Sequence, residues 1–339
     1  MGLQIGEIIP KKEIFLSDLK GKTIAVDAFN AIYQFLTTIR QPDGTPLKDS
    51  KGNITSHLSG LFYRNMNLIL EGIKLIYVFD GEAPELKFKT WKNREEIKEK
   101  YKEKYERALE EEDTEAMARY SRFDVRLDKQ KISESKELLE AMGIAILQAP
   151  GEGEAQASYL AETNLAYAVS SQDYDCLMFK APRLIQNLSM ARKRKTISGF
   201  KEIFPQIIEL KNVLKELEIN QEQLICLGIL CGTDYNPGGV KGLGPKKSLK
   251  LVREHKKKEK IFEAVEKSGI YNLDFDWKII YDEIENPKIE KKIKIEFPKI
   301  NKEKLKDILL KHEFSEERIE KQLIKLDEYI KKSKQKTLF

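Results

Sequence analysis

Cysteine is scarce in this chain, and its pattern excludes two classes of protein. The 339 residues include three cysteines, Cys176, Cys226 and Cys231, with no CxxC pair. An odd number without close spacing argues against both a disulfide framework and a zinc site. Cys226 and Cys231 fall in the apolar run LICLGILCG, where a free cysteine behaves as a small hydrophobic side chain. We therefore interpret these two as packing residues.

Histidine and long apolar runs are also scarce. Only three histidines occur, and they are widely separated, so hydrolytic chemistry would rest on carboxylates and metal rather than on a Ser–His or Cys–His pair. No apolar stretch approaches the ~20 residues of a membrane span, and the N-terminus lacks the apolar run of a signal peptide. We expect a soluble, intracellular protein with no membrane partner.

Charged residues are plentiful but nearly balanced. They form 34% of the chain, yet the formal net charge is only +5, which excludes a histone-like polycation. Carboxylates interrupt the apolar segments, whereas Lys and Arg crowd the polar ones. Such separation suits a protein that binds phosphates with one surface and metal with another. A Lys- and Glu-rich surface that aids solubility or heat resistance explains the composition equally well.

Short apolar runs recur between longer helical stretches. They occupy residues 23–27 (TIAVD), 75–80 (LIYVFD), 143–147 (GIAIL), 166–170 (AYAVS) and 183–187 (RLIQN). Continuous apolar strands separated by helices predict an α/β fold with a largely parallel central sheet covered on both faces.

Two further regions have a different character. Residues 84–130, here called the arch segment, are charged on nearly every side, which predicts one or two long helices that project from the core. Taken alone, an exposed helix with i,i+4 ion pairs is the simpler explanation. From about residue 221 onward we expect helices, with a Gly-rich loop after the first, and the final KKSKQKTLF resembles an unstructured tail.

Acidic residues end the first two predicted strands and follow the third and the fourth. They are Asp27, Asp80, Glu152, Glu154, Asp173 and Asp175. Each acid alone is better explained as a helix cap, a turn or a local hydrogen bond to the backbone. The carboxyl ends of parallel strands meet at one edge of a sheet, where ligands bind. Capping does not require six acids to converge, so we expect a shared site.

Electrostatics indicates what such a site would hold. Two carboxylates about 5 Å apart repel by roughly 3 kcal/mol at an effective dielectric near 20, so six together need protons or cations. Oxygen ligands without His or Cys select hard cations such as Mg²⁺ or Mn²⁺. Two such ions about 4 Å apart would stabilise the attacking water and the leaving oxygen of a phosphodiester. The chain lacks a GxxxxGK[ST] phosphate loop.

Several phrases resemble those of the flap endonucleases, of the archaeal and eukaryotic type. They cover almost the whole chain in order: VDAFNAIYQFL, TSHLSGLFYR, YVFDGEAPELK, APGEGEAQASYLA, SQDYDCLMFKAPR and GTDYNPGGVKGLGPKKSL. The resemblance implies a PIN-like 5′ nuclease core with a helical arch and a helix–hairpin–helix DNA-binding element. It also implies two Mg²⁺ ions, for which Mn²⁺ substitutes, and it adds a seventh ligand, Asp234, to the six acids above.

The resemblance also implies roles for the arch segment and for the first helices. Lys87 and Arg94 would contact the scissile phosphate beside Asp80, and the arch segment would surround the 5′ single strand, with Phe88 or Trp91 meeting bases. It further implies contacts with DNA by Tyr33, which would stack on a base beside the cut, by Arg64 and by Thr55 in the stretch 40–56. Without the family, a core tyrosine is the better interpretation of Tyr33.

The Gly-rich stretch 238–248 resembles the family's hairpin. Gly242 and Gly244 would let backbone amides approach phosphates, and Lys246 and Lys247 would add charge. A monovalent cation such as K⁺ is the further expectation there. The basic patch 192–195 is either a contact to duplex phosphates or a solvated turn.

Two departures from the family pattern stand out. Gly151 replaces the usual serine before Glu152, which is expected to loosen that turn without removing a ligand. The tail 335–339 (QKTLF) begins like a sliding-clamp box and stops early. The tail is therefore either a weak clamp-binding motif or a plain solvated end.

The sequence thus predicts a monomeric, structure-specific 5′ flap endonuclease with 5′–3′ exonuclease activity, acting on intracellular DNA in replication and repair. A related 5′ exonuclease, a bubble-cutting repair nuclease and a junction resolvase are alternatives, as is a non-catalytic DNA-binding scaffold. We expect one nuclease domain over 1–330, composed of 1–83, the arch segment 84–130, 131–220, and 221–330 with the hairpin and C-terminal helices. The tail would follow over 331–339.

Overall fold

A computed structural model describes residues 3–41, 44–82, 84–111, 113–120, 127–188, 193–196 and 199–336. Within these ranges the side chains of residues 85, 88–94, 114, 115, 118, 193–196, 199–201 and 333–336 are not described. The statements below refer to the described parts.

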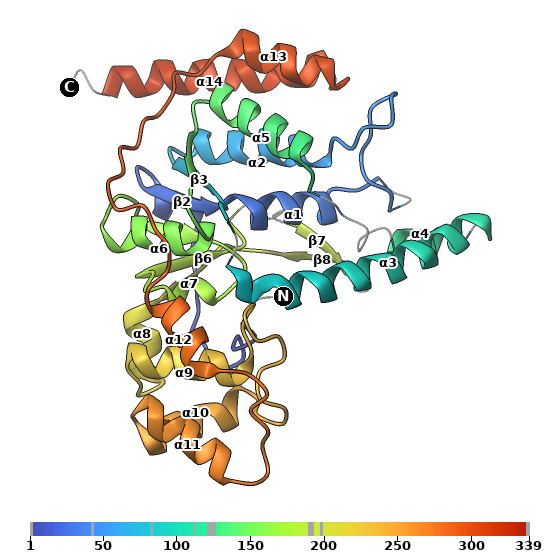
Figure 1. Cartoon of the computed structure of the whole chain (residues 1–339). Coiled ribbons are helices and arrows are strands. Elements are labelled where there is room, and N and C mark those ends of the chain that lie inside the picture. The colour runs from blue at the N-terminus through green and yellow to red at the C-terminus, as the bar shows by residue number, and fades with distance from the viewer. Residues whose placement is uncertain are drawn as a thin grey trace.

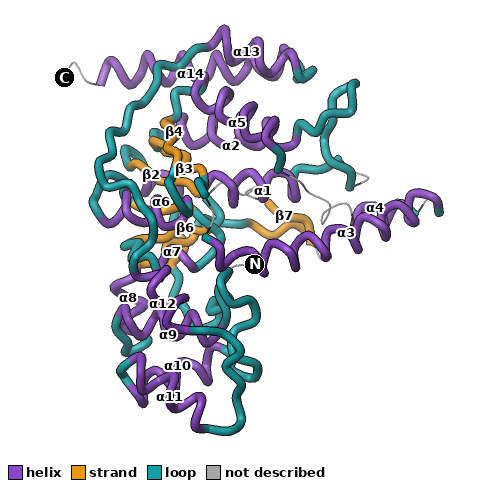
Figure 2. Tube along the Cα trace, viewed as in Figure 1, coloured by secondary structure: helices purple, strands orange, loops and turns teal. Residues whose placement is uncertain are grey.

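A mixed seven-stranded sheet forms the centre of the molecule (Figure 2). Its strands lie in the order β1-β9-β6-β5-β2-β3-β4, and β6, β5, β2, β3 and β4 are parallel to one another. The bounds are β1 Lys12–Glu13, β2 Thr23–Asp27, β3 Lys74–Phe79, β4 Ala145–Gln148, β5 Ala168–Ser170, β6 Arg183–Gln186 and β9 Gln206–Glu209. The expected α/β fold and all five predicted strands are confirmed.

Side chains alternate between two cores along the central strands. Ile24 and Val26 of β2 pack into the core on one face of the sheet, whereas Ala25 packs into the core on the other. In β3, Tyr77 and Val78 divide in the same way. Because successive side chains of a strand point to opposite faces, a sheet buried on both sides reads as a continuous apolar run.

Helices cover both faces of the sheet (Figure 1). One face carries α1, α2 and α5, with α13 and α14 packed outside them, and the other carries α6 and α7, with α8–α12 beyond. The bounds are α1 Ala28–Thr38, α2 Ser56–Leu70, α5 Lys129–Ala141, α6 Gly153–Glu162, α7 Asp175–Met178, α8 Leu210–Glu216, α9 Gln221–Cys231, α10 Pro245–His255, α11 Lys258–Lys267, α12 Trp277–Glu285, α13 Lys302–Lys311 and α14 Glu316–Lys336.

The arch segment projects from this body as helices, as expected (Figure 1). A short 3-10 turn, η2 Glu85–Lys87, leads into α3 Phe88–Glu110, and α4 Thr114–Tyr120 folds back onto it. The Tyr101 and Tyr120 rings lie 6.0 Å apart, and the Lys104 ammonium lies over both. A few aromatic and cation–π contacts therefore hold the two helices together.

Residues 286–300, here called the crossing segment, correct the expectation of helices throughout the C-terminal region. This segment has no helix or strand and runs from α12, along the edge of the molecule, up to α13 (Figure 1). Pro287 and Pro298 disfavour a helix, and the intervening Ile and Lys residues nearly alternate, which is an extended rather than a helical period. The C-terminal helices therefore lie in two places, on opposite faces of the sheet.

Other local expectations were incomplete or wrong. The sequence analysis missed the edge strands β1 and β9 and the hairpin of β7 (Lys193–Thr196) and β8 (Gly199–Glu202). The predicted tail begins too early, because α14 continues to Lys336 through residues that favour helix. The three cysteines are free, as expected. No described helix is long and apolar enough to span a bilayer.

Gly151 is explained by the crossing segment rather than by a loose turn. A Cβ atom at residue 151 would lie 2.9 Å from the Lys288 carbonyl oxygen. Two residues further on, the Glu290 amide donates to Gln156 Oε1 at 2.8 Å, and Gln156 Nε2 donates back to the Glu290 carbonyl at 3.1 Å. The missing side chain therefore lets the crossing segment press against the start of α6.

We predict that Gly151→Ala lowers the free energy of unfolding by about 1–3 kcal/mol, because backbone must move away from the added methyl group. Chemical denaturation measures this effect. Gly244→Ala is the control, since a Cβ there meets nothing within 4 Å and should be nearly neutral. Equal stability of Gly151→Ala and the wild type would contradict the close contact.

Candidate active site

The acidic residues lie where the direction of strand addition reverses. From β2 the chain adds β3 and β4 on one side, and then returns to place β5 and β6 on the other. Asp27 ends β2 opposite Val78, and Ser170 ends β5 opposite Val26. Open α/β sheets bind their ligands at such a switch point, beyond the carboxyl ends of the strands.

Asp27 and Asp173 are joined across this switch point by Asn30. The Asn30 amide donates to Asp27 Oδ1 at 3.1 Å, so Asp27 does cap α1. The Asn30 side chain donates to Asp173 Oδ2 at 3.1 Å and accepts the Gln172 amide at 3.2 Å. A capping role and convergence on a shared site are therefore compatible for Asp27.

Asp80, Glu152 and Glu154 gather around the start of α6. The Gly153 amide donates to Asp80 Oδ1 at 2.7 Å, which places a carboxylate at a helix N-terminus, where it is stabilised. Ser171 donates to Glu154 Oε1 at 3.1 Å. Glu152 is the N-cap residue of α6 but makes no capping bond with its side chain. Its carboxylate instead pairs with Lys87 and accepts a hydrogen bond from Tyr235.

Asp175 lies at the start of α7 and is bound to the N-terminal segment. It is almost fully buried, and its Oδ1 accepts the Leu3 amide at 2.9 Å from 172 residues away. A single buried hydrogen bond of this kind fixes the carboxylate without neutralising it.

Burial and mutual repulsion raise the pKa of several acids of the site. Burial, then Asp80 and Asp173, raises the pKa of Asp27 to about 7. Burial, then Asp173 and Asp234, raises the pKa of Asp175 to about 7. Burial raises the pKa of Asp80 and, with the charges of Asp27 and Asp175, raises the pKa of Glu154. Burial and the neighbouring carboxylates therefore disfavour the charged form of four of the seven acids.

The Lys87 side chain lies among the acids and carries a positive charge. Its ammonium forms an ion pair with Glu152 and lies 3.7 Å from Asp234 Oδ2. Burial alone would lower the pKa of Lys87, but the attraction of Glu152 and Asp234 outweighs it and raises that pKa. Lys87 immediately precedes α3, at the base of the arch segment. The arch segment therefore contacts the acids directly through Lys87.

The oxygen donors of the seven acids suit a hard cation, although the side chains in their present positions do not form a complete coordination site. Within the described residues, no group of three or more His, Cys, Asp or Glu is arranged to hold a metal ion. The donors offered by the seven acids are oxygen atoms alone, and burial with mutual repulsion raises the pKa of four of them. Their identity and uncompensated charge therefore fit a divalent ion such as Mg²⁺, provided that carboxylates rotate.

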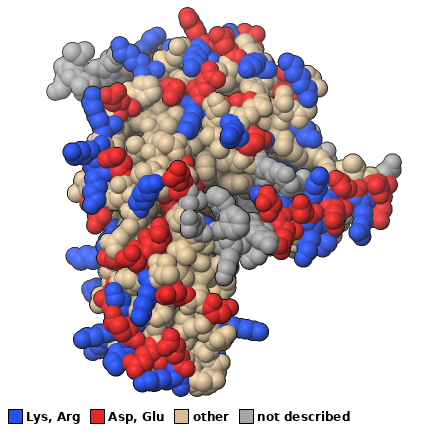
Figure 3. All heavy atoms as spheres, viewed as in Figure 1, with Lys and Arg blue, Asp and Glu red and all other residues tan. Residues whose placement is uncertain are grey.

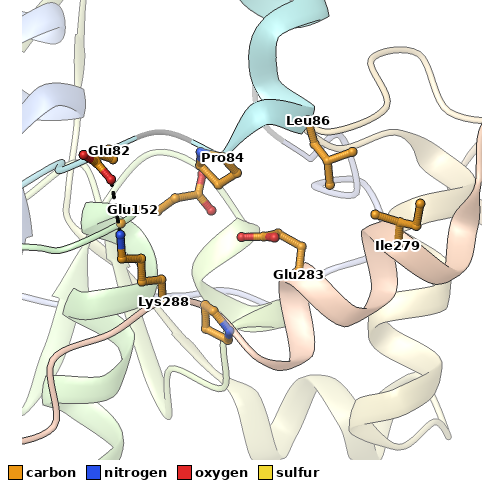
Figure 4. Close-up of a pocket in the computed structure, with 9 residues that line it drawn as sticks. Glu82, Pro84, Leu86, Glu152, Ile279, Glu283 and Lys288 are labelled. Atoms are coloured by element: carbon orange, nitrogen blue, oxygen red, sulfur yellow. Dashed lines mark hydrogen bonds and ion pairs between the residues drawn. The ribbon is translucent and has the colours of Figure 1, made fainter.

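A cavity of about 540 Å³ adjoins the acids (Figure 4). Glu152 and Glu283 face each other across it, and Lys288 pairs with Glu82 at 3.3 Å along its rim. Burial and the charge of Glu152 raise the pKa of Glu283. The crossing segment and α12 thus form a wall beside the site.

The candidate DNA contacts near the arch segment differ in exposure. Tyr33 is half-buried in α1, with the Lys98 ammonium 5.7 Å from its ring centre. Arg64 is partly buried in α2, and burial lowers its pKa. Thr55 precedes α2 and is only 5% exposed, with its amide bonded to the Leu47 carbonyl. Of these three side chains, Tyr33 is the one with a described contact to α3, through Lys98.

The Gly-rich stretch forms a hairpin between α9 and α10. Val240 and Leu243 are buried and anchor it. Gly239 has a positive φ, and a Cβ there would lie 2.4 Å from the Gly232 amide. Gly242 and Gly244 are exposed, and Lys246 and Lys247 begin α10 at the surface. Backbone groups and two lysines therefore face solvent together at a helix N-terminus.

Part of the expected site lies outside the described residues. This applies to the side chains of Phe88, Trp91 and Arg94, to the side chains of the basic patch 192–195, and to the tail from Thr337. Along the described part of α3 and α4, basic and acidic side chains alternate on the visible face (Figure 3). That surface is mixed in charge rather than uniformly cationic.

Sequence reasoning did not select several residues that shape the site. Asn30, Ser171, Tyr235 and Glu283 all touch or face the seven acids. Asn30 and Tyr235 lie within the quoted phrases VDAFNAIYQFL and GTDYNPGGVKGLGPKKSL, so their proximity to Asp27 and Asp234 was an available signal. Glu283 lies in an ordinary amphipathic helix, and nothing in its local sequence distinguishes it.

Comparison with known proteins gives consistent results. The XPG N-terminal domain matches residues 4–101, and the XPG I-region matches residues 143–234. Flap endonuclease 1 of Pyrococcus furiosus is 50% identical, covering 100% of this chain and 98% of that protein. Flap endonuclease 1 of Hyperthermus butylicus is 47% identical, covering 96% and 94%.

Solved structures agree with these matches. Flap endonuclease-1 from Methanococcus jannaschii has a TM-score of 0.76 at 40% identity, covering 98% of this chain and 100% of that one. The catalytic core of Rad2 in complex with DNA substrate has a TM-score of 0.69 at 23% identity, covering 94% and 96%. The second likeness shows the fold alone.

We predict that chelated protein loses stability as pH rises from about 4 to about 7. The folded-state pKa values of Asp27 and Asp175 are raised above 3.8 to about 7, so the folded state binds more protons than the unfolded state in this window. The free energy of unfolding should fall there by about 1 kcal/mol or more, and Mg²⁺ should flatten the slope. Denaturant titrations with chelator and with Mg²⁺ measure it. Asp27→Asn combined with Asp175→Asn should make the slope shallower, and the remaining slope comes from Asp80 and Glu154, whose pKa values are also raised. An identical slope in that double variant would contradict the assignment.

Proposed function

This chain belongs to the flap endonuclease family of XPG-type nucleases, and on that premise we propose that it cuts branched DNA at the base of a 5′ single strand. The motif resemblance is confirmed by relatives that match over nearly the whole chain. The observation that carries the proposal is the convergence of seven acids and Lys87 at the switch point of the sheet. The reaction is the hydrolysis of a phosphodiester bond.

We propose that the seven acids hold two divalent cations, with Mg²⁺ as the physiological ion and Mn²⁺ as a substitute. Bound there, such ions supply positive charge to the attacking water and to the leaving 3′ oxygen. The set comprises Asp27, Asp80, Glu152, Glu154, Asp173, Asp175 and Asp234. Backbone amides already orient three of them, because Asn30, Gly153 and Leu3 donate to Asp27, Asp80 and Asp175.

Lys87 has a second task in this proposal. Its ammonium lies beside Glu152 and Asp234, at the point where the arch segment meets the acids. A cation held there can contact the scissile phosphate and offset the negative charge that develops in the transition state. Arg94, seven residues further along the chain in α3, is proposed for the same role.

Recognition of DNA is assigned to surfaces on either side of the acids. The hairpin around Gly242 and Gly244, with Lys246 and Lys247, would bind duplex phosphates through backbone amides and charge, together with a K⁺ ion. Tyr33 of α1 would stack on the base beside the cut, and Arg64 would hold a phosphate of the template strand. Thr55 would contact DNA in the wedge and 3′-flap pocket of the stretch 40–56. The arch segment would enclose the 5′ strand. Shape, rather than base sequence, would then decide the substrate.

We further propose that residues 1–330 act as one monomeric nuclease domain on intracellular DNA, during replication and repair. A sliding clamp would engage the tail at 335–339. The 5′ exonuclease, bubble nuclease and junction resolvase share this kind of chemistry. The identity of 50% and 47% to proteins named Flap endonuclease 1 favours flap cleavage.

The central test combines a flap assay with Asp80→Asn. The wild type should cut a labelled 5′-flap duplex at the base of the flap with Mg²⁺ and not with chelator. Asp80→Asn keeps the acceptor for the Gly153 amide but removes a charge, so cleavage should fall by roughly 100-fold or more while flap binding persists. Asp307→Asn, an exposed acid on α13, is the control. An Asp80→Asn variant that binds the flap poorly but cleaves bound flap at the wild-type rate would overturn the role assigned to Asp80.

We also predict that Lys87→Met slows cleavage at least about tenfold under single-turnover conditions, because it keeps the alkyl stem and removes the charge. Lys102→Met is the matched control, since Lys102 is an exposed lysine of α3 and pairs only with Glu106 of the same helix among the ion pairs described. A rate equal to that of the wild type would remove Lys87 from the catalytic set.

A further inference from the structure

Tyr235 holds one oxygen of Glu152 in place. It follows Asp234 directly, is 8% exposed, and its hydroxyl donates to Glu152 Oε2. The acceptor lies 83 residues earlier in the chain, at the start of α6. This contact joins the turn after α9 to the acids at the edge of the sheet.

The turn that presents Tyr235 is fixed by buried hydrogen bonds. The Asn236 side chain accepts from the Thr233 amide at 3.1 Å and from its hydroxyl at 2.7 Å, and it donates to the Ile229 carbonyl at 2.7 Å. The Tyr235 amide in turn donates to Thr233 Oγ1 at 3.1 Å. These bonds fix the backbone of the turn that carries Tyr235.

The surroundings of the phenol keep it a donor. Its hydroxyl donates to Glu152 Oε2. The Lys87 ammonium lies 5.3 Å from the centre of the ring and pairs with the other oxygen of Glu152. Glu283 faces the same carboxylate across the cavity (Figure 4). Tyr235 and Lys87 therefore each hold one oxygen of a carboxylate that Glu283 repels.

We propose that Tyr235 is a positioning residue that orients Glu152 for the binding of a divalent cation by the seven acids. The inference rests on the proposed function. Hydrogen bonds from outside the ligand set typically change metal affinity 10–100-fold when removed. Tyr235 touches neither the substrate nor the reacting atoms in this scheme, and it acts through Glu152 alone.

A merely structural tyrosine would behave differently. Tyr77 supplies the comparison, because its buried hydroxyl donates to Asn65 Oδ1 at 2.9 Å, away from the acids. Removing either hydroxyl should cost some stability, since a buried acceptor loses its partner. Only the loss at Tyr235 should change the affinity for a metal ion.

The experiment measures Mn²⁺ binding by titration calorimetry in the absence of DNA. Tyr235→Phe should raise the dissociation constant about tenfold, and Tyr77→Phe should leave it within about twofold of wild type. In single-turnover cleavage of a 5′ flap, the Mn²⁺ concentration for half-maximal rate should rise by a similar factor for Tyr235→Phe. The rate at saturating Mn²⁺ should stay within about threefold of wild type, because the ligand itself is intact.

A double-mutant cycle tests whether the effect passes through Glu152. In the Glu152→Gln background, adding Tyr235→Phe should change Mn²⁺ affinity no further. Unchanged affinity in Tyr235→Phe, or an equal loss in Tyr77→Phe, would overturn the positioning role while the nuclease assignment stands. A wild type that neither binds Mn²⁺ nor cuts the flap would overturn the proposed function and this inference with it.

Discussion

Repulsion among buried carboxylates is the constraint on which this structure depends. Seven acids converge at one sheet edge, and burial with mutual charge raises the pKa of Asp27, Asp80, Glu154 and Asp175. Such a cluster persists only because the fold around it is stable enough to hold like charges together. Backbone amides at helix starts offset part of the cost, and Lys87 offsets another part.

The need to hold these acids explains why distant parts of the chain meet at the site. The Leu3 amide, near the N-terminus, binds Asp175, and the turn after α9 brings Asp234 to Lys87 and Tyr235 to Glu152. The crossing segment packs behind α6 through Gln156 and against Gly151. Strand ends supply most of the carboxylates, and loops from elsewhere in the chain fix their directions.

The same arrangement places the hairpin and the base of the arch segment next to the acids. The hairpin follows Asp234 by only a few residues, and Lys87 lies where α3 leaves the body. Under the proposed function, DNA bound to the hairpin and to the arch segment would pass the acids. Short connections between the binding surfaces and the acids would suit an enzyme that reads the shape of a junction.

The sequence by itself determined the five parallel strands, the acids at their ends, the projecting helices and the Gly-rich hairpin. These follow from local patterns, since apolar period, turn residues and charge are read over a few neighbours. Only the tertiary structure decided the extended path of the crossing segment, the length of α14, and the contacts of Asn30, Tyr235 and Glu283 with the acids. Those depend on which distant segments pack together, and a local pattern carries no information about partners 80 or 170 residues away.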